Sequence, residues 1–148
     1  MTSRQPPAPR GRKGQAMVEA SLVMLVFLAV FIGILDFGQV MYFHQALTER
    51  ARAAARYAAV NVYTDPGNDT KRVAVFNRPD PPEGTAPIVA GLTIAMVTVT
   101  LSGAAGDPNA HIRVDIANFP VTFFTPGLAK IMNARVRVTM PYEVPAAP

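Results

Sequence analysis

Among the carboxylates of the chain, Glu19 has the most unusual chemical setting, because it directly precedes an apolar run. The sixteen residues from Ala20 to Leu35 carry no charge, and the next ionisable group is Asp36. A carboxylate among apolar side chains is costly unless a positive group compensates it, so it normally has a partner or a function. Glu19 is therefore the first candidate for a functional residue, and its chemistry would be charge pairing.

Other residue types that carry chemistry are few. The chain contains two histidines, His44 and His111, and no cysteine, so a zinc site would need several carboxylates and has no ligand spacing. The sequence contains no glycine-rich phosphate loop, no Gly-x-Ser-x-Gly elbow and no paired-carboxylate motif. We therefore expect no enzymatic activity, no catalytic or metal-binding residue and no cofactor.

A basic cluster precedes Glu19, and a membrane-length apolar run follows it. The basic residues are Arg4, Arg10, Arg12 and Lys13. The span from Ala16 to Leu35 contains twenty residues, or about 30 Å of helix, which matches the hydrocarbon thickness of a bilayer. Because Lys and Arg resist translocation, we expect the N-terminus in the cytoplasm and everything after about Phe37 outside.

The apolar run does not end like a cleaved secretory signal. Such a signal has a shorter apolar core followed by small residues of the Ala-x-Ala kind, whereas this run ends Ile34-Leu35-Asp36-Phe37. Gly14 instead lies between the charges and the apolar run, and Glu19 is the fifth residue after it. This arrangement resembles the prepilin processing site, where a membrane peptidase cuts after glycine on the cytoplasmic side and leaves the apolar helix attached. The resemblance implies a processing site formed by Gly14, Gln15 and Glu19.

The resemblance extends along the helix. The segments that carry it are Gly14-Gln15-Ala16-Met17-Val18-Glu19, Gly33-Ile34-Leu35-Asp36-Phe37-Gly38 and Gln45-Ala46-Leu47-Thr48, followed by Ala51-Arg52 and Ala55-Arg56-Tyr57-Ala58. As a set in register, they look like the TadE-like family, the minor pilins or pseudopilins of the tight-adherence pilus. The sequence departs from that family in having Ala20 where an aromatic residue usually follows the glutamate, Leu25 where proline is frequent and Gln39 where arginine is frequent.

The family resemblance implies partners and a location. The partners would be a prepilin peptidase, other pilin and pseudopilin subunits, the inner-membrane assembly platform of the pilus and the lipid bilayer. The location would be the bacterial inner membrane, crossed once, or the pilus itself. Packing and assembly of the helix would involve Glu19, Ala29, Gly33, Asp36 and Phe37. Of these, Ala29 and Gly33 form a small-xxx-small step that permits close approach of helices.

The net charge does not indicate a nucleic-acid partner. The formal net charge is +4, but residues 1–14 hold four basic and no acidic residues, so the rest of the chain holds ten of each and sums to zero. A domain that binds nucleic acid would carry its basic residues on a folded face. We therefore expect no nucleic acid among the partners.

After the apolar run the helix becomes amphipathic. Small and apolar residues recur at steps of three and four, namely Leu47, Ala51, Ala54, Ala55, Ala58 and Val62. The helix should therefore leave the membrane and run from Met17 to about Val62, roughly 70 Å if unbroken. These patterns divide the chain into a basic leader (1–14), the transmembrane part of the helix (15–43), its amphipathic extension (44–63) and an extracytoplasmic β-rich head (64–148).

The remaining sequence changes its apolar period from about four to two. The segments Arg72–Phe76, Ala95–Ser102, Ile112–Ile116 and Arg135–Met140 read as strands with one apolar and one polar face. Phe119–Leu128 fits either a strand with a bulge or a packed loop. The expected fold is α+β and pilin-like: a long N-terminal helix with a small antiparallel sheet laid on its amphipathic half.

Three functions are compatible with these observations. The family resemblance favours a minor pilin that takes part in assembly or priming of a tight-adherence pilus, used in adhesion and biofilm formation. The alternative is an unprocessed single-pass membrane protein whose outward domain binds a partner or a surface. A membrane-tethered enzyme is disfavoured, because no convergent set of titratable residues is visible. Cleavage after Gly14 distinguishes the first two.

Overall fold

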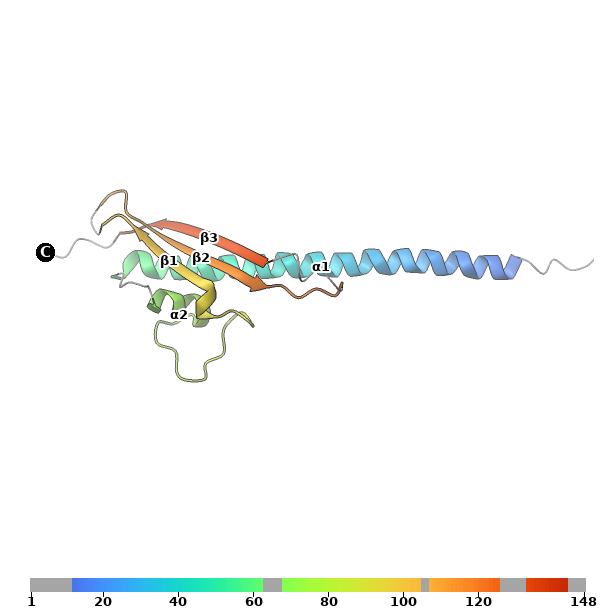
Figure 1. Cartoon of the computed structure of the whole chain (residues 1–148), viewed down its shortest axis with the longest axis horizontal. Coiled ribbons are helices and arrows are strands. Elements are labelled where there is room, and N and C mark those ends of the chain that lie inside the picture. Colours follow the sequence, from blue (N-terminus) through green and yellow to red (C-terminus); the bar gives the residue numbers. More distant parts are fainter. Residues whose placement is uncertain (1–11, 63–67, 105–106, 126–132, 144–148) are drawn as a thin grey trace, which may run out of the picture.

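One helix runs through the molecule, and the other elements lie along its C-terminal half (Figure 1). The computed structural model describes residues 12–62, 68–104, 107–125 and 133–143. The long helix, α1 (Arg12–Val60), contains 49 residues and is roughly 70 Å long. It begins before the predicted Met17 and ends two residues before the predicted Val62. Most of the predicted leader lies outside the described residues.

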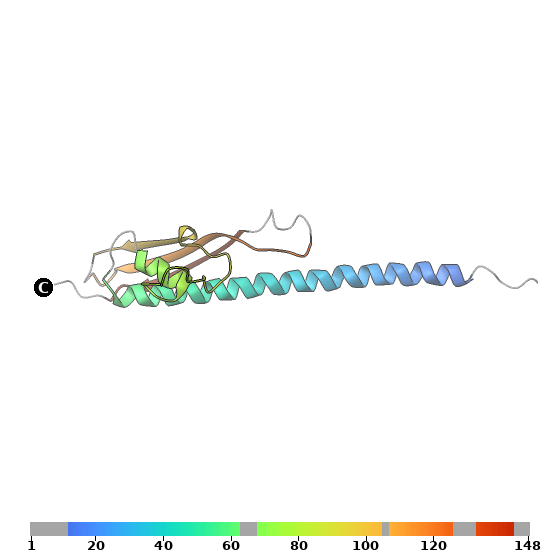
Figure 2. The same ribbon diagram turned by 90° about the horizontal axis from the view of Figure 1, so that it is seen from below.

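A three-stranded antiparallel sheet forms the head. The remaining elements in chain order are α2 (Asn68–Phe76), the 3-10 helix η1 (Ile94–Met96), β1 (Val97–Ser102), β2 (His111–Pro120) and β3 (Asn133–Pro141). The strand order is β1-β2-β3, so that Val114 of the central strand pairs with Val99 on one side and Val138 on the other. Figure 2 shows the sheet along one side of α1, while the N-terminal half of the helix extends beyond it. The expected α+β fold is confirmed.

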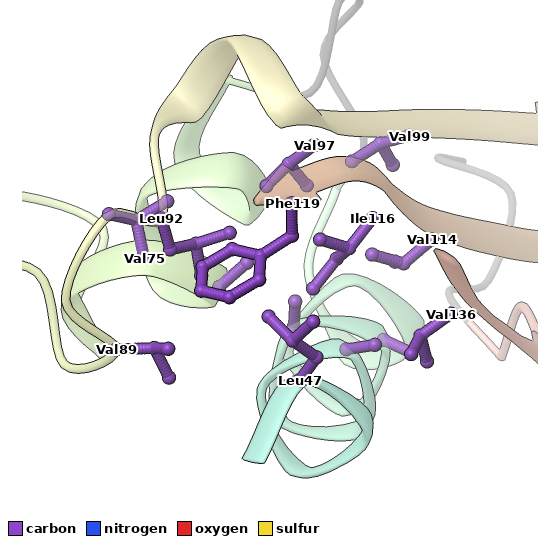
Figure 3. Packing of buried hydrophobic residues seen from close by; sticks show 14 of the residues in the cluster. Leu47, Val75, Val89, Leu92, Val97, Val99, Val114, Ile116, Phe119 and Val136 are labelled. Atoms are coloured by element: carbon purple, nitrogen blue, oxygen red, sulfur yellow. The ribbon is translucent and has the colours of Figure 1, made fainter. Parts of the chain in front are cut away.

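The head is held to α1 by an alanine-rich face of the helix. Leu47, Ala51, Ala54, Ala55 and Ala58 are at most 2% exposed, and they pack against the apolar side of the sheet. Alanine side chains let the strands approach the helix closely. Figure 3 shows Phe119 from β2 filling the space between Leu47 on α1 and Val75 on α2.

Enlarging one of these alanines should loosen the head. Ala55→Leu adds three carbons at a fully buried position, and overpacking of this kind costs about 1–3 kcal/mol. We expect the variant to unfold at lower temperature in detergent, followed by circular dichroism of the full chain. Arg52→Leu, on an exposed position of the same helix, should change the stability by less than about 0.5 kcal/mol. Equal stability of Ala55→Leu and the wild type would contradict tight packing of the sheet on α1.

The predicted strand at Arg72–Phe76 is wrong, because these residues belong to helix α2. Thr70, Val73 and Ala74 are all buried, and their spacing of three and four places them on one side of a helix. Asp69 lies in the first turn, and its carboxylate is 3.5 Å from the Arg72 guanidinium. The run is too short for its apolar pattern to separate a strand from a helix.

The segment Phe119–Leu128, for which the sequence left a bulged strand or a packed loop open, begins with the last two residues of β2, and the bulge lies just before it. The pairing of β2 with β3 shifts register between Ile116 and Phe119, and Asn118 has a φ of 59°. The strand then continues to Pro120, and Val121 to Thr125 follow without helix or strand. The remainder of the predicted segment lies outside the described residues. β1 is also shorter than predicted, because η1 occupies Ile94–Met96.

Candidate functional site

The N-terminal part of α1 stands clear of the head (Figures 1 and 2). Every residue from Gly14 to Leu35 is exposed, and large apolar side chains there range from 38% exposed at Ile32 to 73% at Met17. This helix is long and apolar enough to cross a membrane. An apolar surface of this size marks contact with lipid or with other protein. We call residues 14–35 the bare segment of α1.

The bare segment ends at Asp36, whose side chain is held by the head. Asp36 is 5% exposed, although its neighbours Leu35 and Phe37 are exposed. One carboxylate oxygen accepts the backbone N–H of Phe124 at 2.6 Å. The other accepts the backbone N–H of Thr125 at 3.2 Å and also the Thr125 hydroxyl. Asp36, Phe124 and Thr125 together form what we call the junction site.

The junction site attaches the loop after β2 to the long helix through hydrogen bonds. A buried carboxylate is tolerated when hydrogen-bond donors surround it, and bonds to a charged acceptor are about twice as strong as neutral ones. Phe124 and Thr125 lie beyond the end of β2, so their N–H groups have no strand partner and need another acceptor. Asp36 supplies it, and it thereby fixes how far the head reaches toward the bare segment.

The other predicted site residues lie away from the head contacts. Gly14, Gln15, Glu19, Ala29, Gly33 and Phe37 are all exposed. A methyl group built on Gly14 or Gly33 would meet nothing within 4 Å. Glu19 forms no hydrogen bond or ion pair with any residue that the structure describes. The structure therefore brings Asp36 to the loop and leaves the predicted processing residues near the other end of α1, about 25–33 Å from Asp36 along the helix.

Sequence reasoning missed Phe124 and Thr125 as partners of Asp36. One signal was available, because Asp36 is the one charged residue between Glu19 and Glu49. A charge in such apolar surroundings requires a partner. Nothing in the sequence shows where that partner lies, since Thr125 is 89 residues further along the chain.

Asp36→Asn should release the loop without unfolding the head. The asparagine amide nitrogen cannot accept a hydrogen bond, and the remaining oxygen is neutral, so both backbone N–H bonds weaken. We expect hydrogen exchange of the Phe124 and Thr125 amides to become about tenfold faster, measured by mass spectrometry on the full chain in detergent. Asp115→Asn is the matched control, because Asp115 bonds the Arg137 side chain at 2.6 Å on the other face of the sheet. Unchanged exchange in Asp36→Asn would show that the carboxylate does not hold the loop.

Among the comparisons with known proteins, one family model matches part of the long helix. The family model described as TadE-like protein matches residues 14–56, and no curated protein and no solved structure matches the chain. The matched range contains the bare segment, Asp36 and most of the helix face that packs on the sheet, and it ends before the sheet. The resemblance seen in the sequence is confirmed over residues 14–56, where the chain is similar to the TadE-like family.

Proposed function

We propose that the chain is a minor pilin that takes part in assembly or priming of the tight-adherence (Tad) pilus and so in adhesion and biofilm formation. The observation that supports this most is the difference between the two halves of α1. From Gly14 to Leu35 the helix is exposed throughout and largely apolar, with Glu19 as its one charge, whereas from Asp36 onward one face is buried under the head. Lipid covers such a segment before assembly, and the helices of other pilin and pseudopilin subunits cover it afterwards.

The proposed topology has the leader in the cytoplasm and the head outside. The four basic residues of the leader favour this orientation. The junction site supports an outer membrane boundary near Asp36, because irregular backbone exposed to lipid does not occur within the hydrocarbon region. The hydrocarbon span would then run from about Ala16 to Leu35, the same twenty residues that the sequence predicts, inside the 15–43 assigned to the transmembrane part of the helix. The chain would be a single-pass protein of the bacterial inner membrane until it joins a pilus.

The proposed maturation step is cleavage after Gly14 by a prepilin peptidase. The Gly14–Gln15 bond lies in the first turn of α1, where helix ends fray and where glycine weakens the helix further. The side of the helix at Gly14 is open, since a methyl group there would meet nothing within 4 Å. A peptidase would therefore unwind about one turn without disturbing the head. The cleaved chain would then meet the assembly platform.

Exchanging the anchor tests this function against the alternative of a permanently anchored binding protein. In a strain lacking the chain, residues 1–35 are replaced by an unrelated single-pass helix of equal length and orientation, and Asp36 is kept. If α1 packs among pilin helices, the exchanged chain should be inserted and folded but should give no more pili than the deletion strain. Wild-type numbers of pili with the exchanged anchor would show that the head alone carries the function. The unaltered gene, returned to the same strain, is the control.

A further inference from the structure

The loop of the junction site presents an exposed aromatic ring beside the end of the apolar helix. Phe124 is 61% exposed, although its backbone N–H is fixed at 2.6 Å from the Asp36 carboxylate. The preceding Phe123 packs against the core. Phe37, next to Asp36 on the helix, is 66% exposed. In Figure 1 the loop after β2 extends along α1 toward its N-terminal half. The position of Phe124 along α1 is therefore that of the end of the bare segment.

We propose that Phe124 inserts into the outer interface of the phospholipid bilayer and gives the head a second membrane contact beside α1. This inference rests on the proposed membrane span of α1. Aromatic side chains gather at the membrane–water interface, and Phe124 and Phe37 are both exposed where the bare segment ends. With two contacts, α1 and the head packed on it have a restricted tilt relative to the membrane plane.

The junction site also lowers the free energy needed to move the backbone N–H groups of this loop from water to the membrane interface. Backbone N–H groups without partners are costly in the low-dielectric part of a bilayer. The Asp36 carboxylate binds the N–H groups of both Phe124 and Thr125, so these two donors reach the interface already paired. The segment from Val121 to Thr125 contains no ionisable residue. Phe124 therefore approaches the membrane with its backbone donor already paired and with no ionisable side chain in its own loop segment.

A single tryptophan makes the proposal measurable, because the chain contains none. Phe124→Trp is placed in the full chain, and the protein is reconstituted in phosphatidylcholine vesicles whose acyl chains carry bromine at a shallow or a deep position. We expect blue-shifted emission that shallow bromine quenches more strongly than deep bromine. Combining Phe124→Trp with Asp36→Asn should reduce the quenching, since the loop is then no longer held at the end of the bare segment.

Two matched tryptophan variants distinguish a failure of the proposed membrane span from a failure of the inference about Phe124. Val26→Trp lies in the middle of the bare segment and is 60% exposed, whereas Val62→Trp lies beyond the far end of α1 and is 78% exposed. Deep bromine should quench the first, and neither lipid should quench the second.

If Val26→Trp is not quenched, the membrane span itself is wrong and the inference falls with it. If Val26→Trp is quenched while Phe124→Trp emits like Val62→Trp, only the inference is overturned. A blue-shifted Phe124→Trp that bromine leaves unquenched would show that protein, such as a second copy, covers the ring, and would also overturn it.

Discussion

Replacing Glu19 by glutamine is expected to abolish piliation while leaving the chain inserted, cleaved and folded. Glutamine keeps the size and the hydrogen bonding of the side chain and removes only its charge. The head should be unaffected, because Glu19 lies in the bare segment and contacts none of the buried core. In strains that carry this variant we expect wild-type amounts of cleaved chain and no pili, measured by immunoblot and electron microscopy.

The physical reason is that a carboxylate inside the membrane boundary needs a cation that its own chain does not offer. Lys13 lies six residues before Glu19 and leaves with the leader if cleavage occurs. Cleavage also creates a cationic α-amino group on Gln15, and in a bundle of staggered helices this group would meet Glu19 of a neighbouring subunit. Away from bulk water such a pair is attracted strongly, since the effective dielectric constant is low.

A matched substitution outside the bare segment separates this effect from a general loss of charge. Glu49 is an exposed residue of the same helix beside the head, and Glu49→Gln should leave piliation unchanged. Wild-type numbers of pili in the Glu19→Gln strain would show that the charge is dispensable and that Glu19 is an interfacial residue that reaches lipid headgroups.

Replacing Gly14 by alanine should block maturation and therefore piliation. A methyl group at Gly14 meets nothing within 4 Å in the folded chain, so a loss of cleavage would reflect recognition by the peptidase and not misfolding. We expect the variant to accumulate at its full mass in the membrane fraction. Gly38→Ala is the control, because Gly38 is an equally open glycine of the same helix beyond the bare segment, and its cleavage should be normal. Normal cleavage of Gly14→Ala would argue against glycine as the recognised residue.

The features that the sequence predicted well are those set by local periodicity. The buried face from Leu47 to Ala58 follows steps of three and four, and in β2 the residues Ile112, Val114 and Ile116 alternate with half-buried neighbours. Such patterns report which side of an element is covered. They fail for short runs: Arg72–Phe76 reads as a strand, but it is part of α2, because five residues are too few to separate the two periods.

The junction site was not predictable, because it is a contact between distant parts of the chain. The sequence marks Asp36 as an isolated charge, but the groups that satisfy it are backbone N–H groups, which every non-proline residue possesses. The resemblance suggested Asp36 as a helix-packing residue, and the structure gives its carboxylate partners within the same chain. Glu19 differs in this respect, since it has no such partner among the described residues. Asp36 and Glu19 thus have different roles in our proposal: Asp36 orders the head and Glu19 acts between subunits.

The N-terminal residue of the mature chain tests the proposed function most directly. Intact-mass analysis and N-terminal sequencing would be performed on the chain purified from cells that make functional pili. We predict a chain that begins at Gln15, because in our proposal a prepilin peptidase removes residues 1–14 before the helix enters the assembly. A chain that retains Met1 or begins at Thr2 in piliated cells would contradict the proposed maturation and would favour a permanently anchored protein.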